Sequence, residues 1–318
     1  MSVYKKLWFL FIFCLIVFSI VGCKTLDETK TLEGTHQIRD STGAVVQVPD
    51  NPTRVVPIGV STEDMVISLV GPQKIVALGN LPNNFPEESK QIKAKVKLNT
   101  EAVLALHPDL LIVPDWVDQE MVVTLRGLNV PVYVYKAPIT IDGSEKTILE
   151  LADLLNQKSK GEAIVNSMQQ RLVKVAAFTE QVKSRKIVGF YGVLGLTGGI
   201  GSTFDNMTQL INAANAAALL GLDISESGTR EDLIRINPDI IIVPSNVYSF
   251  DQYKEIEVTS LYSDPALKDV KAVKNHQIYV IDARWIMSYS QFMINGIEEL
   301  ARVTYGYSCL LYTSPSPR

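Results

Sequence analysis

The chain has 318 residues, with 30 Lys and Arg against 34 Asp and Glu, so its formal net charge is −4 at pH 7. Without the first 22 and the last ten residues, 27 basic groups face 34 acidic groups, and no long run of Lys or Arg is present. This acidic balance argues against a nucleic-acid partner, and a hydrophobic fraction of 47% argues against a disordered chain. At about 100–200 residues per domain, the length predicts two domains.

The N-terminus has the organisation of a secretory leader. The basic pair Lys5-Lys6 precedes an apolar run from Leu7 to Val21, which is shorter than the about 20 residues of a membrane-spanning helix. The run ends in Ile20-Val21-Gly22-Cys23, which resembles the lipobox of bacterial lipoproteins, where the Cys thiol is acylated. We therefore expect a signal peptide over residues 1–22, lipidation of Cys23, a polar tether over 23–36 and an extracytoplasmic body anchored to the bacterial cell membrane. The alternative is an uncleaved anchor with an incidental Cys.

The first elements of the body are a hairpin, a strand and a helix. Ile38–Val48 predicts a hairpin, and Arg54–Ile58 predicts a short apolar strand. The apolar helix that follows ends at Gly71, and Ser61 is a candidate for its N-cap. Ile75–Leu78 predicts the next strand.

The most informative feature is an internal repeat. Glu101–Pro114 (EAVLALHPDLLIVP) matches Glu231–Pro244 (EDLIRINPDIIIVP) at an offset of 130 residues. Each copy predicts a short helix, a Pro-Asp turn and a buried strand, and four-residue apolar runs between helices are typical of parallel strands covered on both faces. The sequence therefore predicts two similar α/β lobes with mostly parallel sheets, over residues 37–143 and 185–308.

A long amphipathic stretch separates the two copies. Apolar residues recur at steps of three and four from Ile164 to Val182, which predicts one helix over about Lys158–Lys183. We expect this bridging region, residues 144–184, to hold the lobes almost rigidly, with a ligand cleft between them.

The second lobe begins with a predicted strand at Lys186–Val193 and a glycine-rich loop at Gly195–Gly201. The loop lacks the Lys of a nucleotide-binding P-loop, so we expect its glycines to let the backbone approach a ligand closely. A helix is predicted from about Thr203, capped by Ser202 or Thr203, to near Gly221. Ile278–Ile281 predicts a late strand and Ser290–Tyr305 the last helix.

The C-terminal residues 309–318 have no link in pattern to the helix before them. The string resembles the translation of a sequencing adapter, so the hypothesis is that the native gene continues past about Tyr307 and leaves the second lobe truncated here. The alternative is a genuine disordered tail. The Cys residues are Cys14, Cys23 and Cys309, so the body offers no Cys for a disulfide, a metal or a nucleophile.

Lipobox, paired lobes and bridging helix together resemble the substrate-binding lipoproteins of ABC importers for iron-siderophores, haem and vitamin B12, over roughly Ile38–Gly306. In that family, one Glu on each lobe docks onto Arg residues of the permease. This Glu lies seven residues before the Pro-Asp turn. Glu101 and Glu231 match this position. The resemblance implies a permease dimer with its cytoplasmic ATPase as partner, and a monomeric binding protein. The alternative is that each Glu only favours the first turn of its helix.

In two-lobed α/β binders the ligand lies beyond the carboxyl ends of the strands. Loops at those positions carry aromatic side chains that suit a flat, partly apolar ligand, and Arg284 suits a carboxylate or catecholate. Helix N-termini near Ser61 and Ser202 offer N–H donors. The candidate ligand-binding residues are Trp116, Tyr191, Trp285, Phe204, Phe85, Arg284, Ser61, Thr62 and Tyr248. The alternative is that these aromatic residues pack on their own lobes.

No cofactor of the protein itself is expected, although the ligand may contain iron or cobalt. The three His residues do not suggest a metal site: His36 lies in the tether, and His107 takes the repeat position of Asn237, which indicates a structural role. Tyr191 and Tyr289 are candidates to ligate haem iron.

The predicted function is capture of a cobalamin-like, ferric-siderophore or haem ligand for an ABC importer, without catalysis. The alternatives are a lipid-anchored α/β enzyme, disfavoured by the absence of a Gly-x-Ser-x-Gly motif or cofactor fingerprint, and an adhesion or signalling module.

Overall fold

The computed structural model describes residues 33–80, 87–245 and 258–308, and from Gly34 onward they belong to one compact unit. The predicted leader, Cys23 and most of the tether lie outside the described residues, as do Phe85, Tyr248 and residues 309–318. The described part begins with the predicted hairpin, formed by β1 (Thr35–Arg39) and β2 (Val45–Pro49). Among the described residues, no helix combines the length and apolar character needed to cross a membrane.

The first lobe contains a parallel sheet in the order β3-β6-β7 and a second pair, β4-β5. All four residues of β7 are buried, as are all five of β6, because helices cover both faces of the sheet. The strands are β3 (Val55–Pro57), β4 (Leu78–Gly79), β5 (Lys95–Val96), β6 (Leu110–Pro114) and β7 (Val132–Tyr135). The helices are α2 (Val60–Val70), α3 (Thr100–Ala105) and α4 (Gln119–Gly127), with 3-10 turns at Pro72–Lys74 and Glu87–Gln91.

The second lobe repeats this plan, with parallel strands in the order β10-β8-β11-β12 and β9 antiparallel to β8. Two α/β lobes with mostly parallel sheets therefore confirm the predicted fold class. The strands are β8 (Ile187–Gly192), β9 (Gly195–Thr197), β10 (Ala214–Asn215), β11 (Ile240–Ser245) and β12 (Ile278–Asp282). The helices are α7 (Thr203–Leu210), α8 (Ala216–Leu219), α9 (Arg230–Ile236), α10 (Val258–Ser263), α11 (Lys271–Lys274), α12 (Ala283–Ile286) and α13 (Met293–Tyr305).

The two copies of the repeat make the same backbone contacts. Asp109 exchanges hydrogen bonds with Arg54, whose N–H donates to Asp109 Oδ1 (2.9 Å) and whose carbonyl accepts from Asp109 N (3.1 Å). Asp239 does the same with Ile187, at 2.9 Å for both bonds. His107 and Asn237 both have left-handed backbones, with φ of 46° and 50°. The shared Pro-Asp turn therefore fastens β3 in one lobe and β8 in the other, and His107 occupies a turn position.

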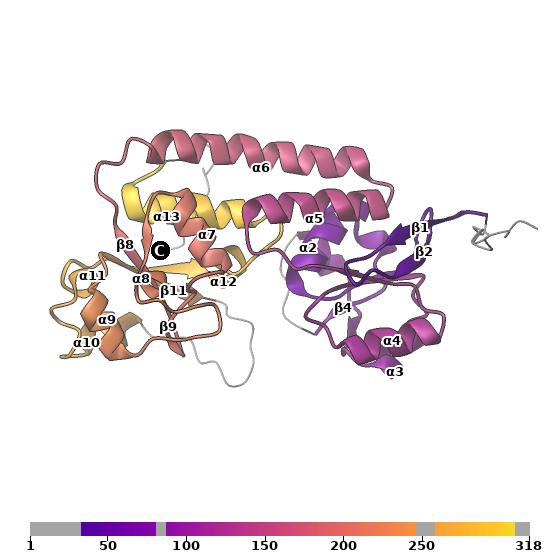
Figure 1. Cartoon of the computed structure of the whole chain (residues 1–318), viewed down its shortest axis with the longest axis horizontal. Helices are drawn as coiled ribbons and strands as arrows, with labels where there is room; N and C mark the ends of the chain where they lie inside the picture. Colours follow the sequence, from indigo (N-terminus) through magenta and orange to yellow (C-terminus); the bar gives the residue numbers. More distant parts are fainter. Residues whose placement is uncertain (1–32, 81–86, 246–257, 309–318) are drawn as a thin grey trace, which may run out of the picture. The chain divides into compact units, whose positions relative to one another are not determined.

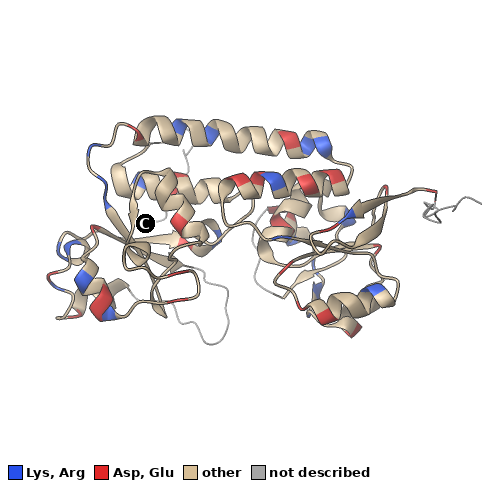
Figure 2. Cartoon of the chain, viewed as in Figure 1, with Lys and Arg blue, Asp and Glu red and all other residues tan. Residues whose placement is uncertain are grey.

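The predicted bridging helix is α6 (Lys158–Thr179), which packs along α5 (Ile141–Leu154) and α13 (Figure 1). Acidic residues predominate on α5 and basic residues on α6 (Figure 2). Arg171 of α6 makes an ion pair with the buried Glu298 of α13, with Nη2 and Oε2 2.6 Å apart. One hydrophobic core runs from α2 through α5 and α6 to α13, so the lobes share an interior. This shared core supports the expectation of a nearly rigid connection.

Two local predictions were wrong. Ser61 does not cap α2: Gly59 occupies the N-cap position with a φ of 100°, and Ser61 lies inside the helix. The helix expected to reach Gly221 ends at Leu210, because Asn212 adopts a left-handed backbone (φ 56°) and the chain then enters β10 before α8. Ser202 does cap α7, accepting from Asp205 N at 3.0 Å.

The glycine-rich loop approaches its own lobe instead of open space. A Cβ built on Gly199 would lie 2.1 Å from the carbonyl oxygen of Leu222, and one built on Gly195 would lie 2.2 Å from that of Gly228. Backbone atoms cannot give way as a flexible side chain does. The glycines are therefore needed for β9 and the following turn to pack against residues 222–228. Their close contacts are with the backbone of their own lobe, and not with the open space in which a ligand was expected.

Replacement of Gly199 by Ala is expected to lower the free energy of unfolding by about 2 kcal/mol, since the added methyl group overlaps backbone. Gly192→Ala in the neighbouring strand is the matched control, because a Cβ there meets nothing within 4 Å. Urea unfolding of the two variants checks this, and equal stabilities would contradict the steric argument.

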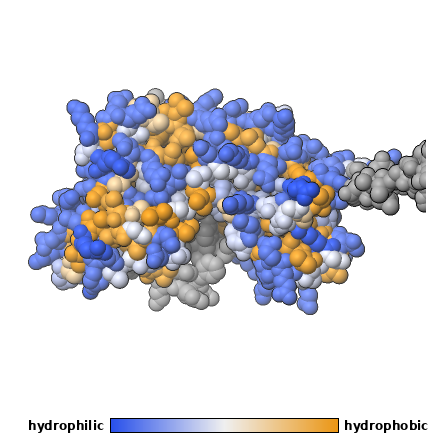
Figure 3. Space-filling view, in the orientation of Figure 1, coloured by the Kyte–Doolittle hydropathy of each residue, from blue (hydrophilic) through white to orange (hydrophobic). Residues whose placement is uncertain are grey.

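The surface of the second lobe exposes several large apolar side chains, and orange patches gather there in the space-filling view (Figure 3). They include Leu194 at the β8–β9 turn, which is 63% exposed, and Ile224, which is 60% exposed.

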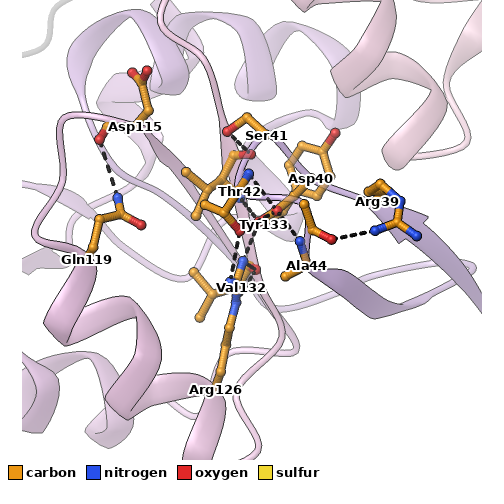
Figure 4. A network of polar contacts seen from close by, with 12 residues as sticks. Arg39, Asp40, Ser41, Thr42, Ala44, Asp115, Gln119, Arg126, Val132 and Tyr133 are labelled. Atoms are coloured by element: carbon orange, nitrogen blue, oxygen red, sulfur yellow. Dashed lines mark hydrogen bonds and ion pairs between the residues drawn. The ribbon is translucent and has the colours of Figure 1, made fainter.

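A polar network fastens the N-terminal hairpin to the first lobe (Figure 4). The buried carboxylate of Asp40 accepts from Thr42 N (2.9 Å), Thr42 Oγ1 (2.6 Å) and Val134 N (3.1 Å), and it pairs with Arg126. Arg126 also donates to Val132 O through Nη2 (2.8 Å). Burial acts to raise the pKa of Asp40, but these hydrogen bonds and the charge of Arg126 outweigh it and hold the pKa below its ordinary value.

Candidate functional site

Side chains of α2 meet residues 289–291 of the second lobe in a contact that we call the interlobe seam. Ser61 Oγ accepts from Tyr289 N at 3.2 Å. Ser290 Oγ donates to Asp64 Oδ2 at 3.1 Å, and Gln291 Nε2 donates to Asp64 O at 3.0 Å. Ser61, Asp64 and Ser290 are buried. The seam therefore links the lobes by hydrogen bonds that are shielded from water, beside the carboxyl end of β3.

Trp116 and Tyr289 extend the seam toward solvent. Trp116 follows β6 and is 56% exposed, and its Nε1 donates to the hydroxyl of Tyr289 at 3.3 Å. A Cβ added to Gly59 would lie only 3.2 Å from Cζ2 of Trp116, so Gly59 leaves room for the indole ring. An exposed indole therefore lies where the first lobe meets the second, and its contact with a ligand stays a prediction.

A pair of buried hydroxyl groups joins α2 to strand β7. Thr62 Oγ1 and the Tyr135 hydroxyl are 2.6 Å apart and share a buried hydrogen bond. Burial raises the pKa of Tyr135 well above its ordinary value, and burial also raises the pKa of Tyr289. The negative charge of Asp115 acts in the same direction on both. Both phenols therefore keep their protons at neutral pH.

The other predicted aromatic residues pack to different extents on the cores of the protein. Phe204 is 1% exposed and packs on Phe190 with ring centroids 5.1 Å apart, so it offers no wall to a ligand. Tyr191 packs against the core of its own lobe, where burial raises its pKa and the charge of Arg230 opposes that rise. Trp285 packs against the shared core. Only Phe204 is fully buried; Tyr191 and Trp285 are partly buried, and their contact with a ligand stays a prediction.

Arg284 is engaged by a neighbour in the sequence. Its Nε donates to Asp282 Oδ1 at 2.8 Å, and Nη2 makes an ion pair with the same carboxylate. Both side chains are mostly buried. Because Asp282 already neutralises the guanidinium, Arg284 is a poor receptor for a second anion.

The two predicted docking carboxylates occupy equivalent places. Glu101 is exposed in the first turn of α3, whose N-cap Asn99 accepts from Ala102 N at 2.8 Å. Glu231 is exposed in the first turn of α9, which begins with a reciprocal cap between Thr229 and Asp232. The caps differ, but both leave the Glu side chain at the surface at the start of its helix.

The sequence analysis missed strand β7 and with it Tyr135 and Lys136. The signal was present in residues 130–135 (VPVYVY), where β-branched and aromatic residues alternate. Lys136 is exposed directly after the strand, beside Asp115, whose Oδ1 accepts from Ala137 N at 3.0 Å. These two residues bring opposite charges to the same edge of the first lobe. Among the described residues, no three His, Cys, Asp or Glu side chains gather into a metal-binding group.

Comparison with known proteins gives a consistent result. A family model described as periplasmic binding protein matches residues 60–285. An uncharacterized ABC transporter substrate-binding lipoprotein of Bacillus subtilis, YvrC, is 22% identical over 282 residues, covering 84% of this chain and 85% of its own. A cobalamin-binding protein of Halobacterium salinarum is 22% identical over 209 residues, covering 64% of this chain and 57% of its own.

Solved structures share the fold. Molybdate-bound MolA of Haemophilus influenzae superposes with a TM-score of 0.72 at 20% identity, covering 85% of this chain and 91% of MolA. The haem-binding protein RhuT of Roseiflexus sp. RS-1 superposes with a TM-score of 0.69 at 20% identity, covering 79% of this chain and 97% of RhuT. At such identities the likeness establishes the fold alone.

Proposed function

Because the chain belongs to the periplasmic binding protein family, we propose that it is the monomeric, lipid-anchored solute-binding subunit of an ABC importer. Cys23 carries the lipid and residues 23–34 form the tether, which is two residues shorter than expected because Thr35 and His36 belong to β1. The body captures its solute outside the cytoplasmic membrane and delivers it to a permease dimer, whose cytoplasmic ATPase drives transport. The protein itself performs no catalysis.

The observation that carries this proposal is the pair of equivalent carboxylates. Glu101 and Glu231 stand at the same position of two repeats whose Pro-Asp turns make the same backbone contacts, and both are exposed. Two equivalent acidic groups suit ion pairing with a two-fold partner that presents two equivalent basic groups. If each Glu served only to stabilise the first turn of its helix, an exposed Glu would not be required at the same repeat position in both copies.

The proposed solute is a large chelate or corrinoid: a cobalamin-like compound, a ferric siderophore or haem. Trp116 supports this class, because a half-exposed indole at the seam offers a flat apolar surface. The pairing of Arg284 with Asp282 disfavours a small oxyanion such as molybdate.

Titration of the full-length chain in detergent, with tryptophan fluorescence as the readout, tests this proposal. The probes are cyanocobalamin, hemin, ferrioxamine B and molybdate, with free tryptophan as the control for inner-filter quenching. Saturable quenching at micromolar or lower concentration is expected for at least one of the first three. Saturation by molybdate alone, or by none of the four, would contradict the proposed ligand class.

A further inference from the structure

A group of large apolar side chains on the second lobe is exposed to solvent, and we call it the apolar platform. Its members are Leu194 at the β8–β9 turn, Ile200 after β9 and Ile224 in the segment before α9, which are 63%, 50% and 60% exposed. Single exposed apolar residues are common on protein surfaces, whereas a contiguous group of them marks a surface that a partner covers.

Backbone hydrogen bonds make the platform contiguous. Ile200 N donates to Leu222 O at 2.8 Å, and Ile224 N donates to Ile200 O at 3.0 Å. Leu196 and Gly228 exchange two further bonds, of 3.0 and 2.7 Å, which fasten β9 to the segment before α9. The glycine-rich loop permits this close approach because its glycines carry no Cβ. The platform is therefore preformed, so its burial by a partner requires little ordering of the chain.

The platform borders the proposed docking carboxylate of the second lobe. Gly228, which is bonded to β9, directly precedes the N-cap Thr229 of α9, and Glu231 lies in the first turn of that helix. Ile234, three residues further along α9, is 41% exposed. Residues three apart on a helix are neighbours on its surface. Large apolar side chains are therefore exposed both before and after Glu231 in this part of the lobe.

Charged groups around the platform select the kind of partner. The exposed carboxylates in the segment before α9 and in its first turn are Asp223, Glu226 and Glu231. The cations of α9 are already engaged, since Arg230 pairs with Asp264 at 2.9 Å. Arg235 likewise pairs with Asp232 at 2.6 Å. A second copy of this acidic surface, or an anionic membrane surface, would meet like charge, whereas an apolar surface bordered by basic groups would be complementary.

We infer that the apolar platform is a docking surface for the permease, which covers it with an apolar surface bordered by Arg or Lys. This inference rests on the proposed function and adds that docking of the second lobe depends on apolar burial as well as on the charge of Glu231. The interface then has an apolar centre with charged groups around it, as specific protein interfaces do.

The test compares the wild-type chain with its Ile200→Thr/Ile224→Thr variant, in which a hydroxyl replaces the ethyl group of each Ile. Cells that lack their own copy of the gene carry either full-length chain, and uptake of cyanocobalamin, hemin and ferrioxamine B is measured. The variant is expected to take up whichever probe the wild-type chain delivers about ten- to a hundredfold more slowly, because less apolar surface is buried on docking. Its affinity for that probe in calorimetric titration is expected to stay within about twofold of wild type.

Val123→Thr/Val173→Thr is the matched control, since both Val side chains are 66% exposed on helices, α4 and α6, outside the platform. It is expected to transport normally. Circular dichroism checks that the variants fold. Leu194→Ser, at the exposed turn, is the second variant should the double variant not fold, and it is expected to lower uptake about threefold or more.

Normal uptake by the platform variant, alongside lost uptake in Glu101→Ala/Glu231→Ala, overturns this inference and leaves the proposed function standing. A fall in solute affinity would assign the platform to solute binding, and a wild-type dimer that the variant dissociates in sedimentation would assign it to a second copy. Either result overturns the inference. If the wild-type chain supports uptake of none of the three probes, the inference and the proposed function are both contradicted.

Discussion

Replacement of both Glu101 and Glu231 by Ala is expected to abolish solute uptake while leaving solute affinity unchanged. Each carboxylate is exposed at the start of its helix and takes no part in the interlobe seam. At about 2 kcal/mol for each charge-assisted contact, loss of both weakens docking to the permease roughly a thousandfold. Each single variant is expected to keep partial transport, because one contact remains.

The measurement is cellular uptake of whichever probe ligand the wild-type chain binds, alongside its affinity for the isolated protein. The double variant Glu120→Ala/Glu162→Ala is the matched control, since both residues are exposed acids on helices, α4 and α6, outside the repeat. It removes the same charge and is expected to transport normally. Normal uptake by Glu101→Ala/Glu231→Ala would refute docking through these residues.

Replacement of Asp40 by Ala is expected to lower the free energy of unfolding by about 2–4 kcal/mol. The change leaves Arg126 with a poorly solvated charge and removes acceptors from Thr42 and Val134. Chemical denaturation measures the loss, and Asp269→Ala, an exposed Asp on the second lobe, is expected to stay within about 0.5 kcal/mol of wild type. A loss as small as that control would show that the hairpin does not depend on this network.

The same carboxylate predicts a pH dependence. The pKa of Asp40 in the folded chain lies below its unfolded value of about 3.8, so the folded state favours the charged form. Its contribution to stability is fully present above the unfolded pKa and is lost as the pH falls through the folded pKa. We expect Asp40→Asn to unfold with a flatter pH dependence than wild type below about pH 4, measured by thermal melts. Parallel curves for the two proteins would contradict this assignment.

The repeat explains why the fold was predictable. An apolar run of four residues after a Pro-Asp turn specifies a buried strand, and the second copy specifies a second lobe, because both signals depend on neighbours in the sequence. The same holds for α6, because its apolar residues recur at helical steps within one stretch of the sequence. Strand β7 was missed although its alternation is also local, and the loop after it, with Lys136, was therefore never considered.

The composition of the site was less predictable, because burial depends on residues far apart in the chain. Trp116 and Tyr289 are 173 residues apart, and Ser61 and Tyr289 are 228 apart. Phe204 follows a strand and a loop as a ligand-contacting residue would, yet it packs on Phe190 in the core. Arg284 was expected to receive an anion, yet its partner stands two positions away, because the start of α12 turns both side chains toward each other.

Local sequence thus determined the lobes, the bridging helix and the matched positions of Glu101 and Glu231, since each depends on periodicity or spacing within a few tens of residues. The tertiary structure alone decided which polar and aromatic side chains lie at the interlobe seam and which enter the core. That choice depends on how two lobes pack through α5, α6 and α13, and a pattern along one strand or helix carries no information about the partner it meets across the interface.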